Sequence, residues 1–277
     1  MTDAAAWAEK VGRTWADEWP RTERAFAGIA AVLDHRIAAL APVVGSALDV
    51  GSGAGSTALV LAAARPGLTV IGADLSPDLV AVARDRAAGR GNCRFVLADA
   101  RDAARDAAPL DFVVSRHGVM FFDDPVSGFA ALRRSCRPGT PLIFTCFRPR
   151  VSNEWSAAVD RTSGRDVAEG GYAPGPYALA DDRFTGDVLA RAGWAGASAT
   201  ALDVPYIVGA GTDPVDDALG FYRRIGSAAA VLAAASPPER AELERRLAAM
   251  LATRVRGDVI TFTAAIWLWT AFAGEPA

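Results

Sequence analysis

The sequence has 277 residues, of which 51% are hydrophobic, and its formal net charge is −3. This length fits one large domain or two small ones, and the apolar content is enough for a sizeable core. A chain without a basic excess carries no electrostatic signal for nucleic acid or an anionic membrane, so neither is expected as a partner.

The scarcity of lysine and histidine excludes several kinds of catalytic site. Lys10 is the only lysine, so the chain lacks a P-loop and, apart from that residue, has no lysine for a Schiff base. The two histidines, His35 and His117, form no zinc-binding H-E-x-x-H motif. The three cysteines are far apart, so we expect reduced thiols and no metal site.

Neither end of the sequence predicts a targeting or membrane segment. The N-terminal MTDAAAWAEKVGRTW contains acids and has no apolar core of signal-peptide length. The apolar stretch FTAAIWLWTAFA near the end is too short to span a bilayer. Together with reduced cysteines, this predicts a soluble cytoplasmic protein.

The first part of the chain predicts a helical cover of two helices, over 4–19 and 22–40, separated by Pro20 and ended by Pro42. A regular alternation of short strands and helices follows. The expected strands span 46–50, 68–75, 93–99, 110–116 and 141–147, and the expected helices span 56–66, 76–90 and 124–139. Strands that are apolar on both faces and alternate with helices indicate a parallel sheet covered on both sides.

This alternation ends after residue 148. Two irregular stretches rich in glycine, proline and aromatic residues come next. They are followed by an expected helix over 182–194, a strand over 198–209, a mainly helical segment over 213–256 and a strand over 259–272. The pattern predicts one doubly wound α/β domain with an N-terminal helical cover and a helical insertion.

A glycine-rich loop in the stretch LDVGSGAGSTALV follows the first expected strand and precedes a helix. From Gly53 it satisfies the G-x-G-x-x-A pattern, and Asp74 follows Gly55 by roughly the 20 residues that separate the ribose-binding acid in dinucleotide sites. An NAD(P)-dependent oxidoreductase is therefore one interpretation. This interpretation assigns no role to Asp49 or Asp99, and the chain shows no set of residues typical of hydride transfer.

The same stretch, with GADLS and LADARD, resembles the class I S-adenosylmethionine (SAM)-dependent methyltransferases. Their pattern has an acid and G-x-G-x-G at the first strand, an acid ending the second strand and an aspartate after the third. The matching residues are Asp49, Gly51, Gly53, Gly55, Asp74 and Asp99. The resemblance covers about residues 40–150 and extends more loosely to the C-terminus, as in the ubiquinone/menaquinone branch. It implies a seven-stranded, doubly wound Rossmann-like sheet whose last strand is antiparallel, S-adenosyl-L-methionine as cofactor and S-adenosyl-L-homocysteine as product.

The chemistry of SAM fits these acids, because the molecule has no phosphate but has an ammonium group, a cationic sulfur and two ribose hydroxyls. Carboxylates at Asp49, Asp74 and Asp99 suit the ammonium, the ribose and the adenine amino group. The glycines allow a close approach of the backbone. The residues expected to bind the cofactor are Asp49, Gly51, Ser52, Gly53, Gly55, Asp74, Leu75, Asp99, Ala100, Arg101, Ser115 and Arg116.

The segment after the fourth strand is expected to lie beside the transferred methyl group. His117 is a candidate general base for a hydroxyl, an amine or an acidic carbon, with a shape-filling ring as the alternative. Arg13, Arg116 and Arg148 are candidate partners for carboxylates. The tryptophans at positions 7, 15 and 19 are expected to pack between helices. The expected walls of the acceptor pocket are Met120, Phe147, Trp155, Tyr172 and Tyr177.

These observations favour a single domain over 1–277, with a helical cover (1–42), a cofactor-binding core (43–150) and an acceptor-site cap (151–277) that contains the insertion 213–256. The leading hypothesis is a methyltransferase for a small-molecule acceptor, with O-methylation favoured over N- or C-methylation, acting as a monomer or homodimer. The alternatives are the NAD(P)-dependent oxidoreductase and a SAM-binding protein without transfer activity.

Overall fold

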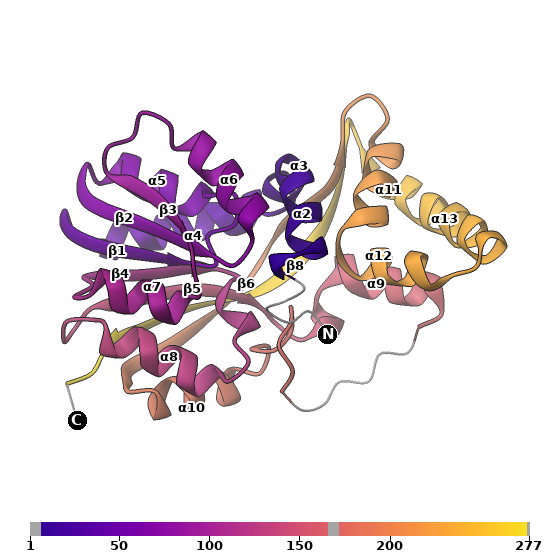
Figure 1. The fold of residues 1–277 in the computed structure, drawn as a ribbon. Helices are drawn as coiled ribbons and strands as arrows, with labels where there is room; N and C mark the ends of the chain where they lie inside the picture. Colours follow the sequence, from indigo (N-terminus) through magenta and orange to yellow (C-terminus); the bar gives the residue numbers. More distant parts are fainter. Residues whose placement is uncertain (1–6, 166–171, 276–277) are drawn as a thin grey trace.

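A computed structural model describes residues 7–165 and 172–275 of the chain. Its strands are β1 (Val44–Val50), β2 (Gly67–Asp74), β3 (Cys93–Leu97), β4 (Phe112–Arg116), β5 (Pro141–Phe147), β6 (Trp194–Ala210), β7 (Val255–Arg256) and β8 (Val259–Ala273). They form one sheet in the order β3-β2-β1-β4-β5-β8-β6, with β7 paired to β8 (Figure 1). The first five strands pair in parallel, and β8 is antiparallel to both β5 and β6.

Some α-helices cover the two faces of this sheet, and the others belong to the N-terminal cover, the helical insertion and the segment between β5 and β6. The α-helices are α2 (Lys10–Asp17), α3 (Trp19–Ala25), α4 (Ala27–Leu40), α5 (Ser56–Ala64), α6 (Pro77–Arg86), α7 (Ala100–Ala107), α8 (Pro125–Arg134), α9 (Glu154–Ser163), α10 (Asp182–Arg191), α11 (Pro214–Arg224), α12 (Gly226–Ala234) and α13 (Pro237–Ala252). Helices α4, α5 and α6 pack on one face, and α7, α8 and α10 pack on the other (Figure 1). Each face has its own apolar core, so the sheet is buried on both sides.

The predicted doubly wound α/β fold with an antiparallel last strand is confirmed. The sheet has eight strands rather than seven, because residues 255–256 form the short strand β7 against the start of β8. Two helices, α7 and α9, were not predicted. Helix α7 (ARDAARDA) has its apolar residues at helical spacing, but all of them are alanines and only Ala103 and Ala104 are buried, so the apolar signal is weak.

The helical cover also differs from its prediction. Pro20 does not separate two helices but lies in the first turn of α3, where the missing N–H has no intrahelical acceptor to lose. The cover therefore contains three helices over 10–40, with breaks at Glu18 and Phe26. The predicted end before Pro42 is confirmed, since α4 stops at Leu40. The predicted start at residue 4 lies outside the described residues.

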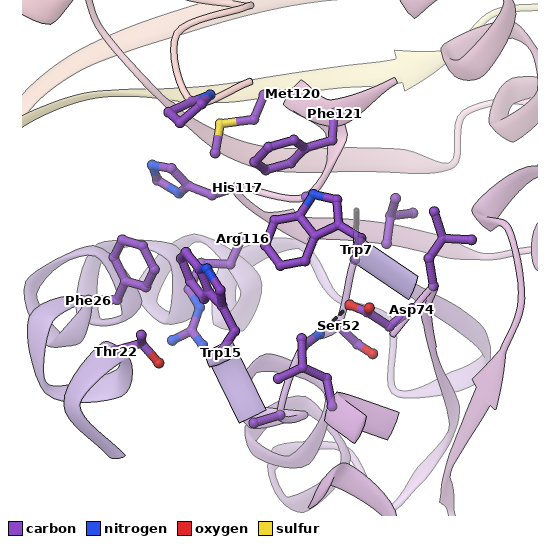
Figure 2. A pocket seen from close by; sticks show the side chains of 18 of the residues that line it. Trp7, Trp15, Thr22, Phe26, Ser52, Asp74, Arg116, His117, Met120 and Phe121 are labelled. Carbon is purple, nitrogen blue, oxygen red and sulfur yellow. Dashed lines mark hydrogen bonds between the residues drawn. The ribbon is translucent and has the colours of Figure 1, made fainter. Parts of the chain in front are cut away.

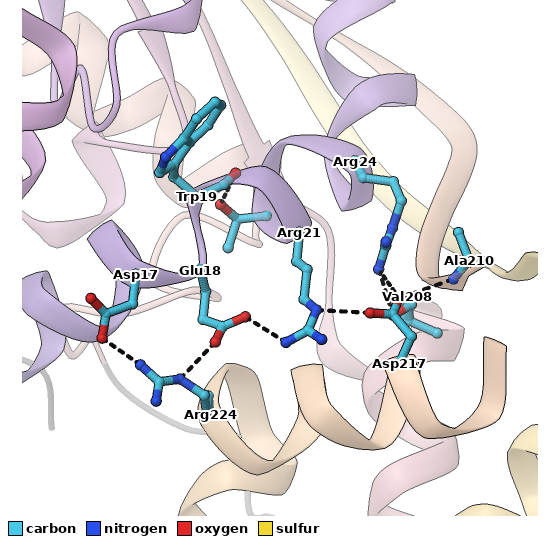
Figure 3. A network of polar contacts seen from close by, with 10 residues as sticks. Asp17, Glu18, Trp19, Arg21, Arg24, Val208, Ala210, Asp217 and Arg224 are labelled. Atoms are coloured by element: carbon cyan, nitrogen blue, oxygen red, sulfur yellow. Dashed lines mark hydrogen bonds and ion pairs between the residues drawn. The ribbon is translucent and has the colours of Figure 1, made fainter. Parts of the chain in front are cut away.

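The predicted helical insertion is confirmed as α11, α12 and α13, which the long strands β6 and β8 carry beyond the rest of the sheet (Figure 1). Helices α2 and α3 lie between the sheet and this insertion. An ion-pair network joins the cover to the insertion (Figure 3): Arg21 and Arg24 of α3 both bond to Asp217 of α11, at 2.8 and 2.6 Å. Arg224, which follows on the same helix, pairs with Glu18 at 2.7 Å. The network holds the cover against the insertion.

Candidate functional site

A cavity of about 230 Å³ opens at the carboxyl ends of β1, β2 and β4, where ligands bind in open α/β sheets (Figure 2). The cover and the insertion close its other sides. Most of the residues predicted for the site line it. They are Asp49, Gly51, Ser52, Gly53, Asp74, Leu75, Asp99, Ala100, Arg101, Arg116, His117, Met120, Phe147 and Trp155.

Four predicted residues do not belong to this lining. Gly55 caps α5 with a left-handed backbone (φ 87°) and lies against the Phe95 ring. The Ser115 hydroxyl donates to the Val50 carbonyl at 2.7 Å. Tyr172 donates its hydroxyl to a backbone carbonyl in the turn before α8, and Tyr177 lies behind Phe147 with its ring 5.9 Å away. Their positions support the walls of the site from outside.

The glycine loop brings backbone to the edge of the cavity. Gly51 has φ 65°, and a Cβ atom there would come within 2.7 Å of the Gly118 Cα atom. Gly53 has φ 53°, with no atom within 4 Å of where its Cβ would be, so it borders open space. Both positions favour glycine, because other residues rarely adopt a left-handed backbone.

Asp49 is a buried acid with one unused oxygen. Its Oδ2 atom accepts a hydrogen bond from the Ala58 N–H at 3.1 Å, whereas Oδ1 is buried without a partner among the described residues. Burial raises its pKa to about 7, against the opposing charge of Arg116. Because an orphaned buried carboxylate oxygen is unfavourable, this position suits a ligand that supplies a cationic N–H donor.

The other two acids are already partly bonded. Asp74 accepts N–H bonds from Gly53 (2.8 Å, on Oδ2) and Ser76 (2.9 Å, on Oδ1), and the backbone N–H of Leu75 also bonds to this carboxylate. Burial raises the pKa of Asp74. Asp99 caps α7 and forms a bidentate pair with Arg101, both contacts being 2.8 Å, and that pairing lowers its pKa.

Arg116 ends β4 and His117 follows it, and both line the cavity. Among the described residues, Arg116 makes no hydrogen bond or ion pair, and burial lowers its pKa. His117 has a left-handed backbone (φ 66°), which is uncommon outside glycine. Its Nδ1 lies 2.9 Å from the Thr145 hydroxyl, and its Nε2 is buried without a partner in the part of the chain that is described. Burial, and then the charge of Arg116, lower its pKa to about 3.

Away from the glycine loop, the cavity is walled by a continuous series of aromatic contacts. The His117 ring is 5.5 Å from Phe26 and 4.3 Å from Phe147. The series continues through Trp155 to Tyr206, with centroids 5.4 and 4.9 Å apart. We call this the aromatic half of the cavity, and the side formed by Asp49, the glycine loop, Asp74 and the 99–101 segment the polar half.

Several lining residues were not predicted from sequence. The three tryptophans of the cover were expected only to pack between helices, yet all line the cavity. Further unpredicted lining residues are Phe26, Phe121, Tyr206, Phe221, Tyr222 and Ile225. Their helical and strand spacing is the same as that of core residues, so no local signal distinguishes them. Two arginines considered as anion partners lie elsewhere: Arg13 is exposed near Asp78, and Arg148 pairs with Asp203 at 2.8 Å.

Comparison with known proteins agrees with this arrangement. Residues 48–144 match the family model described as a methyltransferase domain. A demethylmenaquinone methyltransferase from Thermus thermophilus is 36% identical over 103 residues, which make up 37% of this chain and 47% of that protein. The chain thus spans about half the length of the curated relatives it matches.

Two solved structures share the fold. The YcgJ protein of Bacillus subtilis superimposes with a TM-score of 0.53 at 19% identity, over 88% of this chain and 98% of that one. The Haemonchus contortus phosphoethanolamine N-methyltransferase 2, in complex with S-adenosyl-L-methionine, gives a TM-score of 0.54 at 18% identity, over 96% of this chain and 58% of that one.

Among the described residues, no helix combines the length and apolar character needed to cross a bilayer.

Proposed function

We propose that this chain, whose core is a class I SAM-dependent methyltransferase domain, transfers a methyl group to a small organic acceptor. Oxygen is favoured over nitrogen or carbon as the accepting atom. The observation that carries the proposal is the division of one cavity into a polar half with an unsatisfied buried acid and an aromatic half. Such a division suits a cationic nucleoside beside an apolar second substrate.

The polar half fits SAM better than a dinucleotide. Asp49 Oδ1 would accept a hydrogen bond from the ammonium group, and the Asp74 carboxylate, which lines the same half, would accept from the ribose hydroxyls. The 99–101 segment and the open space at Gly53 would accommodate the adenosine. A pyrophosphate next to the glycine loop would instead meet the buried carboxylate of Asp49, which repels anions.

When bound, SAM supplies a methyl group on a cationic sulfur: the acceptor's lone pair forms the new bond to carbon, and the carbon–sulfur bond breaks with its electron pair on sulfur. The protein's part is to align the acceptor and to exclude water. Aromatic rings from the cover, β5, α9 and β6 build the walls that do this. Outside the polar half, the acidic residues that line the cavity among those described are Glu23, Asp123 and Asp124, and Glu23 bonds to Arg86 at 2.7 Å.

Oxygen is favoured because His117, which burial keeps neutral, lines the aromatic half together with Tyr206 and Tyr222, and these uncharged polar side chains suit an oxygen-bearing acceptor rather than a cationic amine. We also propose that the chain is one domain, in which residues 1–42 cover the cavity, residues 43–150 bind the cofactor and residues 151–277 close over the acceptor. Cytoplasmic placement is proposed from the three buried free thiols, which a reducing compartment preserves.

Two experiments test this function. Calorimetry should detect binding of SAM and S-adenosylhomocysteine but not of NAD; NAD binding without SAM binding would contradict the proposal and support an oxidoreductase. Transfer of a radiolabelled methyl group should then be measured against phenols, carboxylates, quinols and amines. SAM binding without transfer to any of these compounds would instead support a non-catalytic SAM-binding protein.

A further inference from the structure

We propose that His117 donates a hydrogen bond from Nε2 to an oxygen atom of the acceptor, and that the acceptor binds as an oxyanion such as a phenolate, enolate or carboxylate. This assignment rests on the proposed function, because it concerns the acceptor of that reaction. It gives His117 the role of a hydrogen-bond donor in place of a general base.

Thr145 determines which ring nitrogen carries that proton. Its side chain is fully buried in β5, and within the described part of the chain the only hydrogen-bond partner of its hydroxyl is His117 Nδ1, at 2.9 Å. A buried hydroxyl that does not donate leaves an unsatisfied polar hydrogen. The arrangement with fewest unsatisfied groups therefore has Thr145 donating to Nδ1, which places the proton of the neutral ring on Nε2.

The His117 ring is held in place by contacts on several sides, and its Nε2 atom has no partner among the described residues. The His117 backbone N–H donates to the Thr145 carbonyl at 3.1 Å, so both the backbone and the side chain of His117 are attached to the same residue of β5. Phe26 and Phe147 pack against the imidazole and leave it little room to rotate. Nε2 is buried and unpartnered among the described residues, and the side chain lines the cavity near Met120 (Figure 2).

The charges around this donor favour an anion. Arg116 precedes His117, makes no ion pair among the described residues, and its charge lowers the pKa of His117. The carboxylates of Glu23, Asp49 and Asp34 act on Arg116. Burial and Arg116 keep the ring neutral at pH 7, so it remains a donor and cannot gain a proton there. An acceptor that arrives ionised needs no base, because it has no proton to lose when its oxygen takes the methyl group. The transfer then leaves a neutral ester or ether.

Nuclear magnetic resonance of the free protein tests the tautomer directly. The chain has only two histidines, so labelling with ¹⁵N-histidine gives two imidazole spin systems, and a His35→Gln variant assigns them because His35 is exposed on α4. We expect His117 to show a protonated Nε2 and an unprotonated Nδ1, unchanged between pH 5 and 9. A protonated Nδ1, or protonation of both nitrogens at pH 6, would overturn the proposal. This measurement needs neither cofactor nor transfer, so its failure is distinct from failure of the proposed function.

The oxyanion part is tested with 4-nitrophenol bound to the complex with S-adenosylhomocysteine. The phenolate form absorbs visible light, so a titration shows its ionisation in the site. We expect the bound phenol to ionise at a lower pH than the free phenol, and His117→Phe, which keeps a ring but no donor, to remove at least half of this shift. Thr145→Val, which frees Nδ1 from its donor, should reduce it less. An unchanged shift in His117→Phe, an upward shift in the unsubstituted protein, or no binding of the phenolate would overturn the oxyanion assignment.

Discussion

The polar and aromatic halves of the cavity are assembled in different ways. The polar half comes from strand ends and from the loops that directly follow them, within residues 49–101. The aromatic half collects rings from the cover, β5, α9, β6 and α11, which are distant in sequence. Substitutions in the polar half should therefore act through single contacts. Substitutions in the aromatic half should act through the packing of several elements.

The largest effect is expected from Asp49→Asn in the polar half. This change removes the buried charge that would pair with the ammonium group, so SAM affinity should fall by about 100-fold, as when one partner of a buried ion pair is lost. The ligand-free protein should become more stable, because an unpaired carboxylate is no longer buried. Calorimetry and thermal unfolding measure the two effects. The exposed Asp102→Asn is the control, and equal SAM affinity in both variants would contradict the role of Asp49.

The same residue predicts a pH dependence. Folding raises the pKa of Asp49 from 3.8 to about 7, so the folded state binds this proton more tightly than the unfolded state. Stability contributed by the protonated acid is present below pH 4 and is lost as the pH rises to about 7. The melting temperature of Asp49→Asn relative to the unsubstituted protein should therefore increase from pH 5 to pH 8. A constant difference would show that Asp49 does not titrate in this range.

A smaller and different effect is expected from Asp217→Asn, at the junction of cover and insertion. This acid accepts bonds from Arg21, Arg24 and the Ala210 N–H, so its change should reduce the free energy of unfolding by about 1–3 kcal/mol. Because the junction closes the aromatic half, KM for the acceptor should rise severalfold while the Kd for SAM stays nearly constant. Asp106→Asn, an exposed acid on α7, is the control. A change in the Kd for SAM without a change in KM for the acceptor would contradict the assignment of separate roles to the two halves.

The smallest effect is expected from Tyr172→Phe. Tyr172 does not line the cavity, and its hydroxyl donates to the backbone carbonyl of Phe122, a residue that does, so its loss should reduce the free energy of unfolding by about 1 kcal/mol. The acceptor KM should change less than twofold. Steady-state kinetics beside chemical unfolding would measure both quantities, and a tenfold rise in KM would instead place Tyr172 at the acceptor.

Much of the fold followed from local chemistry in the sequence. Strands with apolar residues on both faces, ended by glycine or aspartate, were recognised within a few residues, and the antiparallel last strand came from the family resemblance. The helix that was missed and the helix boundary that was misplaced also have local explanations. Helix α7 buries only two alanines, and Pro20 is compatible with either the end or the first turn of a helix.

By itself, the sequence determined the polar half, because the acids and glycines that form it directly follow strands whose carboxyl ends meet at one edge of the sheet. Only the tertiary structure decided the aromatic half. Trp155 and Tyr206 carry the same apolar spacing as core residues, and whether they face a core or a cavity depends on how β6 and β8 place the insertion against the cover. The tautomer inferred for His117 has the same origin, since Thr145 reaches it from a neighbouring strand.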